Sequence, residues 1–225
     1  MKSDFLYLAS QSPRRSQLLQ QIGVRHETLW PDPDEDVEAL EEALPGESPK
    51  TYVQRVTQLK WNAAIRRLKR RNLPVAPVLC ADTTVALGRR IMGKPADPAQ
   101  AREMLSALSG RAHRVYTVVA VGIPGSFQMA CSESVVRFDH LTQSWIKQYV
   151  ASGEPMGKAG AYAIQGLAAT RIVSLRGSYS GIMGLPLYET AQLIERIVRL
   201  AWGAHNAAGG QPALQDQSCP NKSRV

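Results

Sequence analysis

The sequence predicts an α/β protein with a mixed sheet. Short apolar runs typical of strands alternate with stretches whose apolar residues repeat at helical spacing. Pro124-Gly125 separates two long strand-like runs, and Gly88-Arg89 interrupts a third, so some neighbouring strands should be antiparallel hairpins. Helices and strands interleave without a linker between independent halves, and we therefore expect one domain over residues 1–203.

The first half of the chain carries clear start signals for helices. A strand is predicted over residues 5–9, and Ser12-Pro13 then has the pattern of an N-cap with proline at the first helical position. Ser48-Pro49 repeats this pattern before a second helix. The acidic, proline-rich segment 30–49 has no period and should be a loop. A buried strand over 75–81 is predicted to end at Asp82, and a hairpin follows over 83–92.

In the second half, Asp97-Pro98 should start a third helix, which Gly110 follows. Two long strands are expected over 113–123 and 127–138. Thr142 can cap a helix through Val150, residues 153–166 should form a glycine-rich loop, and a short strand is predicted over 170–175. A last helix is expected over 186–202. Residues 204–225 lose all periodicity, which predicts a disordered tail.

The composition is ordinary for a globular protein, with 44% hydrophobic and 20% charged residues. No apolar run approaches the roughly 18 residues of a membrane span, and the N-terminus does not resemble a secretory signal. The three cysteines, Cys80, Cys131 and Cys219, have no zinc or redox spacing and should be reduced thiols of a cytoplasmic protein. The four histidines show no metal-ligand spacing and are expected at polar surface positions.

A net charge of +8 favours an anionic partner without identifying it. Much of the charge lies in a basic run at the end of the second predicted helix, comprising Arg66, Arg67, Lys69, Arg70 and Arg71. Cations complement the macrodipole there, so the run is either a solvated helix end or a patch for nucleic acid or another partner.

Residues 10–15, between the first strand and the first helix, are a candidate anion site. Ser10 and Ser12 offer hydroxyl donors, and Arg14 and Arg15 offer guanidinium forks that match phosphate. Two arginines in the first turn oppose the helix macrodipole, a conflict that an anionic ligand would resolve. Ordinary surface arginines remain the alternative, and the segment is neither a Walker loop nor a Rossmann fingerprint.

Four further segments can carry chemistry or line the same cleft. Asp82 at a strand end can hold Mg²⁺ or orient a water molecule. The alternative is an aspartate that caps a turn and has no chemical role. Lys94 in Gly93-Lys94-Pro95 can reach a phosphate or balance Asp82, or simply be solvated. In the glycine-rich loop 153–166, Gln165 has both a donor and an acceptor for a base edge, unless the loop is purely structural. Residues 177–186 are compatible with a second wall of the same cleft.

Together these motifs resemble those of the Maf family of nucleoside triphosphate pyrophosphatases. The similarity runs from about residue 6 to residue 193. It rests on six segments in the family's order and spacing, namely LASQSPRR, ADTTV, GKP, LSGRAHRVYT, EPMGKAGAYAIQG and GSYSGIMGLP. The resemblance implies a two-lobed α/β fold with a central cleft, similar to that of the inosine triphosphatase group and often a homodimer. It also implies hydrolysis at the α–β phosphoanhydride with a divalent cation, Mg²⁺ or Mn²⁺.

The resemblance also assigns roles to single residues. Asp82 matches the proton acceptor, Glu35 an acid linked to metal and catalysis, and Lys60 and Lys94 the lysines of the cleft. The implied metal ligands are thus Glu35 and Asp82. Ser10, Arg14 and Arg15 match the phosphate loop. Arg14, Thr83 and Gln165 resemble the specificity positions of the dTTP/UTP subgroup, whereas the 7-methyl-GTP subgroup differs there.

Two departures from the family pattern leave questions for the structure. Gly157 stands where the family usually has Asp, which puts metal handling or loop order in doubt, and the tail beyond Trp202 has no family counterpart. We expect a pyrimidine triphosphate as substrate, and neither a nucleic acid nor a membrane as partner. The alternatives are a modified purine triphosphate such as 7-methyl-GTP or ITP, and a non-catalytic nucleotide- or nucleic-acid-binding regulator.

Overall fold

The computed structural model describes residues 5–208, with side chains described through residue 197. It confirms an α/β fold on a mixed sheet in the order β2-β1-β3-β5-β6-β7, with β4 beside β3. Strand β1 is parallel to β2 and β3, and the other pairs are antiparallel. The strands are β1 (Leu6–Leu8), β2 (His26–Thr28), β3 (Val78–Leu87), β4 (Arg90–Met92), β5 (Ala112–Ile123), β6 (Ser126–Phe138) and β7 (Ile172–Arg176).

Except for a short helix over residues 179–183, which the sequence did not predict, the α-helices begin within one residue of the starts that the sequence signals indicated. They are α1 (Pro13–Gln21), α2 (Pro49–Arg70), α3 (Pro98–Leu108), α4 (Gln143–Ala151), α5 (Tyr179–Met183) and α6 (Leu187–Ala208), with 3-10 turns η1 (Ala39–Glu41), η2 (Ala159–Ala161) and η3 (Leu167–Arg171). Ser48, Asp97 and Thr142 each accept a bond from the backbone N–H three residues on, as N-caps do. Ser12 occupies the N-cap of α1 but makes no such side-chain bond.

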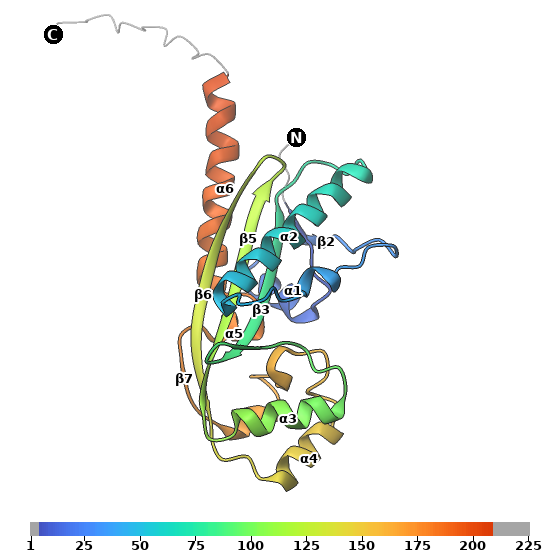
Figure 1. The fold of residues 1–225 in the computed structure, drawn as a ribbon. Helices are drawn as coiled ribbons and strands as arrows, with labels where there is room; N and C mark the ends of the chain where they lie inside the picture. The colour runs from blue at the N-terminus through green and yellow to red at the C-terminus, as the bar shows by residue number, and fades with distance from the viewer. Residues whose placement is uncertain (1–4, 209–225) are drawn as a thin grey trace, which may run out of the picture.

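Two lobes share the long strands β3, β5 and β6 (Figure 1). In one lobe, α2 packs on one face of the sheet through Trp61 and Leu68, while α1 and α6 pack on the other through Leu19 and Leu193. In the second lobe, α3 and α4 enclose a separate core that includes Leu105, Phe138, Ile146 and Tyr162. Strand β3 contributes Leu79 to the first lobe and Val85 to the second, so its middle residues lie at the junction.

The position of Asp82 differs from the prediction. Strand β3 does not end there but continues to Leu87, because its ladder with β5 is unbroken from Val78 to Ala86. On its other edge β3 pairs with β1 only at Val78 and Leu79, and with β4 only from Val85 onward. Residues 80–84 therefore have no strand neighbour on that side, and this gap is open to a ligand.

The C-terminal helix also differs from the prediction. Helix α6 continues to Ala208, past the boundary expected at residue 203, and extends away from the sheet (Figure 1). The rest of the predicted tail, residues 209–225, lies outside the described residues, as does Cys219. Cys80 and Cys131 are free thiols. Within residues 5–208, no helix is long and apolar enough to cross a membrane.

His113 is in the core and not at the polar surface expected from the sequence. It is 2% exposed, stacks on Phe138 and shares a hydrogen bond of 2.9 Å with the Tyr162 hydroxyl through Nε2. Its Nδ1 has no hydrogen-bond partner among the residues that the structure describes. Burial lowers the pKa of His113 to about 4, so the ring is neutral in the folded protein at neutral pH.

The buried His113 should make the protein acid-sensitive. Between pH 6.5 and 4 the unfolded state takes up a proton at this histidine and the folded state does not, so stability is lost as pH falls through that window. At about 1.4 kcal/mol per pKa unit, the loss should be about 3 kcal/mol. We expect His113→Gln to flatten this part of the profile of unfolding free energy against pH. The same substitution at the exposed His140 should leave the profile unchanged.

Candidate functional site

A cleft of about 650 Å³ lies at the junction of the two lobes. That is a typical volume for a small-molecule site. Its walls come from the segment after β1, the η1 loop, α2, the middle of β3, the glycine-rich loop 153–166 and the end of α5. Eight residues predicted from the sequence all line it, namely Ser10, Arg14, Arg15, Lys60, Asp82, Thr83, Lys94 and Gln165.

The alternation of side chains along β3 sends Asp82 and Thr83 to opposite faces of the sheet. Cys80 packs against α2, and Asp82, two residues on, points the same way and meets Lys60 of α2. Ala81 packs toward α1 and α6. Thr83, two residues on, points the same way, and its hydroxyl lies 3.0 Å from the hydroxyl of Thr117. The Thr117 hydroxyl donates to Gly181 O of α5. The uncovered stretch of β3 thus presents an acid on one side and a hydroxyl on the other.

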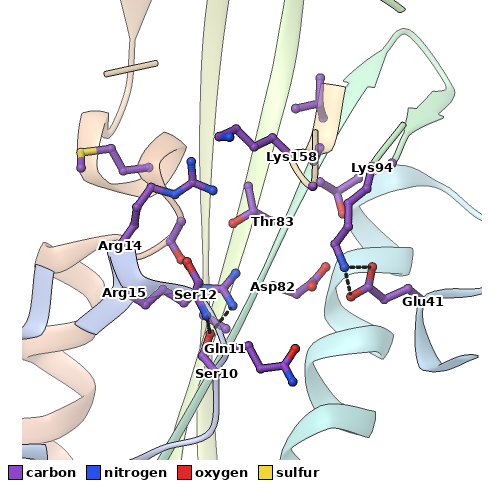
Figure 2. A pocket seen from close by; sticks show the side chains of 18 of the residues that line it. Ser10, Gln11, Ser12, Arg14, Arg15, Glu41, Asp82, Thr83, Lys94 and Lys158 are labelled. Carbon is purple, nitrogen blue, oxygen red and sulfur yellow. Dashed lines mark hydrogen bonds and ion pairs between the residues drawn. The ribbon is translucent and has the colours of Figure 1, made fainter. Parts of the chain in front are cut away.

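Arg14 and Arg15 form one wall of the cleft (Figure 2). Arg15 donates to Ser10 Oγ at 3.0 Å and to Gly184 O at 2.8 Å, which ties α1 to the end of α5. Burial lowers the pKa of Arg15, Asp82 opposes that effect, and Arg14 adds to it. Both arginines line the cleft, and that they bind a ligand there stays a prediction.

Lys158 is a cleft cation that the sequence analysis did not single out. It extends from the glycine-rich loop toward Arg14 (Figure 2) and donates to the carbonyl oxygens of Glu154 and Met156. Burial lowers the pKa of Lys158, and the nearby Arg14 lowers it further. Among the described residues, no carboxylate forms an ion pair with Arg14, Arg15 or Lys158. Three desolvated cations around one space need an anion.

The opposite wall is balanced in charge. Lys60 Nζ lies 2.6 Å from Asp82 Oδ1 and 2.7 Å from Glu41 Oε1, and Lys94 Nζ lies 3.1 Å from Glu41 (Figure 2). Burial alone would lower the pKa of Lys60, but Asp82 and Glu41 outweigh it and raise that pKa. Burial alone would raise the pKa of Glu41, but Lys60 and Lys94 bring it below its ordinary value.

The structure does not bring Glu35 to the cleft. Its carboxylate forms ion pairs with Arg67 and Arg70, and Glu41 is the second acid beside Asp82. Arg67 is buried and also donates to Leu29 O at 3.0 Å, so it holds the loop that follows β2. Glu41 lies in the segment expected to be a loop, where no periodicity could single it out.

The basic run at the end of α2 has a structural role that neither sequence interpretation anticipated. Arg67 and Arg70 bind Glu35, while Arg71 donates to Trp30 O and pairs with Asp32. Arg66 and Lys69 are exposed. Tyr52 adds a bond of 2.8 Å to the carbonyl of Glu41. Helix α2 therefore anchors the acidic loop at both ends and places Glu41 in the cleft.

Gly157, where the family resemblance led us to expect Asp, lies in the cleft wall with φ of +69°. Glycine adopts this left-handed conformation freely, and Asp tolerates it better than most residues do. A side chain here would meet no atom within 4 Å. The glycine therefore leaves the loop unstrained and removes a carboxylate from the wall.

The chain is similar to known proteins over most of its length. The family model described as "Maf-like protein" matches residues 5–197. The chain is 62% identical to a "dTTP/UTP pyrophosphatase" of Albidiferax ferrireducens, over 86% of this chain and 96% of that protein. It is 61% identical to one from Polaromonas sp. over 85% and 95% of the two chains, and 60% identical to one from Ralstonia nicotianae over 84% and 92%. The chain belongs to the Maf family.

Proposed function

We propose that this protein hydrolyses dTTP and UTP between the α- and β-phosphates, releasing the nucleoside monophosphate and pyrophosphate. The observation that carries the proposal is the asymmetry of charge in the cleft. Three cations without carboxylate partners face a wall where Lys60 and Lys94 neutralise Asp82 and Glu41. Relatives that cover nearly the whole domain bear the name dTTP/UTP pyrophosphatase.

The cations without carboxylate partners are where we place the phosphate chain. Arg14 and Arg15 present forked donors, and Lys158 presents a point charge from the facing loop. Ser10 fixes Arg15 and can itself donate to a phosphate oxygen. Charge that develops on the departing pyrophosphate would be stabilised by these donors, and only stabilisation that grows in the transition state raises the rate.

Asp82 is the proposed general base. Lys60 holds one of its carboxylate oxygens, which fixes the orientation of the group toward the gap beside β3. Asp82 would take a proton from a water molecule as the water oxygen attacks the α-phosphorus. The bond from that phosphorus to the bridging oxygen breaks, and pyrophosphate leaves with the bond's electron pair.

A divalent cation, Mg²⁺ or Mn²⁺, fits the carboxylates that are present. No group of three or more His, Cys, Asp or Glu side chains able to hold a metal occurs among the residues described. Mg²⁺ is commonly bound by one or two carboxylates together with substrate phosphates, and Asp82 and Glu41, both bonded to Lys60 Nζ, supply such a pair. When bound, the cation would neutralise phosphate charge. Glu41 replaces Glu35 in this proposal.

For the base we propose recognition by Thr83 and Gln165, with Arg14 nearby. These three resemble the specificity positions of the dTTP/UTP subgroup, and all line the cleft. A modified purine triphosphate would use the same phosphate wall and is the competing substrate class. The nucleic-acid regulator is disfavoured, because Arg67, Arg70 and Arg71 are occupied by Asp32 and Glu35. A homodimer and a cytoplasmic location remain predictions.

Asp82→Asn should fold normally and lose most of the activity. The amide keeps the shape of the carboxylate but is a poor proton acceptor, so kcat for dTTP should fall about 10²–10⁴-fold. Release of pyrophosphate measured with and without Mg²⁺ across dTTP, UTP, CTP, ITP and 7-methyl-GTP tests the assignment. The exposed Asp139→Asn serves as the matched control. Full activity of Asp82→Asn would refute the role of Asp82, and release from none of the triphosphates would refute the proposed function.

Glu41→Gln should remove the carboxylate that Lys60 and Lys94 share, leave Lys60 paired with Asp82 alone, and make the net charge of the cleft one unit more positive. We expect pyrophosphate to bind about fivefold more tightly in metal-free buffer, since one partly screened charge at this range contributes about 1 kcal/mol. The Mg²⁺ concentration needed for half-maximal dTTP hydrolysis should rise. Calorimetric titration and a Mg²⁺ series measure the two effects. Glu42→Gln, an exposed neighbour, is the control, and identical behaviour of both variants would argue against a role for Glu41.

A further inference from the structure

Two side chains of the second lobe, Tyr149 and Glu154, hold the backbone on both sides of Gln165. Ala163 N donates to Tyr149 Oη at 3.2 Å, and Tyr149 Oη donates to Glu154 Oε1 at 2.8 Å. The other carboxylate oxygen, Glu154 Oε2, accepts from Leu167 N at 3.0 Å. The residues two before and two after Gln165 are therefore bonded to one hydroxyl–carboxylate pair.

Close packing makes this arrangement rigid. A Cβ at Gly166 would lie 2.2 Å from Glu154 Oε1, so the carboxylate rests directly on the backbone next to Gln165. Tyr149 is 2% exposed, and burial and its bond to Glu154 raise the pKa of its hydroxyl, which stays protonated and donates. Hydrogen bonds to a carboxylate are stronger than neutral ones, particularly away from water.

The chemistry of Gln165 makes its position decisive. A carboxamide carries both a donor and an acceptor and can satisfy either kind of base edge if it is free to turn. Thymine and uracil present an acceptor at O4, where cytosine presents an amino donor. The groups around the amide decide which of its ends faces the base, and the position of the backbone decides which groups those are. Discrimination between these bases by Gln165 therefore depends on where its backbone is held relative to the cleft.

We propose that the Tyr149–Glu154 pair is a positioning device that sets the discrimination of Gln165 between thymine or uracil and cytosine. Neither side chain lines the cleft, so neither is expected to touch the nucleotide. The inference rests on the proposed function in one respect, that Gln165 contacts the base.

The test is equilibrium binding of dTTP and CTP, measured by calorimetry in EDTA so that no turnover occurs. Glu154→Ala should reduce the ratio of the two dissociation constants about tenfold toward one, as Gln165→Ala should, and Tyr149→Phe should reduce it less. Glu154→Gln should keep the preference, since an amide can accept from Leu167 N and donate to Tyr149 Oη. Glu103→Ala removes a carboxylate of the same lobe from an exposed pair with Arg90 and should change nothing.

A purely structural role has a different signature. If the pair is only structural, its substitution would lower the melting temperature and weaken the binding of both nucleotides equally. The ratio of the two dissociation constants would then stay unchanged, and that result overturns the proposal. Equal binding of dTTP and CTP by the unmodified protein also overturns it. If Glu154→Ala does not fold, Tyr149→Phe carries the same comparison. Absence of pyrophosphate release with Mg²⁺ would refute the proposed hydrolysis, yet the metal-free binding ratio would still decide the role of the pair.

Discussion

The uncovered middle of β3 is the constraint on which the site depends. Strand β1 stops beside Leu79, and β4 joins only at Val85, so residues 80–84 keep one strand neighbour and leave the other edge open. Backbone alternation then sends Asp82 toward α2 and Thr83 toward α5. The two lobes meet at this gap, which is why residues from both converge there.

The two walls of the cleft differ in how their charges are compensated. The partly buried Lys60 and the exposed Lys94 lie beside Asp82 and Glu41, and each charge is compensated within the protein. Arg14, Arg15 and Lys158 have no carboxylate partner among the described residues, so no ion pair neutralises their charge until an anion binds. Placing Glu41 correctly requires a loop without regular structure to be held in place, and the arginines at the end of α2 and the Tyr52 hydroxyl do so.

In the second lobe, side-chain hydrogen bonds likewise hold a segment without regular structure, the glycine-rich loop, in place. Backbone donors of this loop bond to Tyr149 and Glu154, while Lys158 caps its carbonyls. Glycine suits positions 157 and 166 for different reasons, the first because the backbone is left-handed and the second because a carboxylate rests against it. A flexible composition thereby gives a fixed wall for Lys158 and Gln165.

The sequence by itself determined the mixed α/β class, the starts of the helices and the hairpins, because caps, prolines and apolar periodicity are local signals. It also identified those cleft residues that belong to motifs occurring in the order of the family pattern, such as Arg14, Asp82 and Gln165. It placed Asp82 at a strand end, assigned Glu35 to the cleft and missed Glu41 and Lys158. Only the tertiary structure decided these points, since they depend on where neighbouring strands stop and which charges meet across distant segments. No local sequence pattern shows that Arg67 forms an ion pair with Glu35 while Lys60 forms one with Glu41.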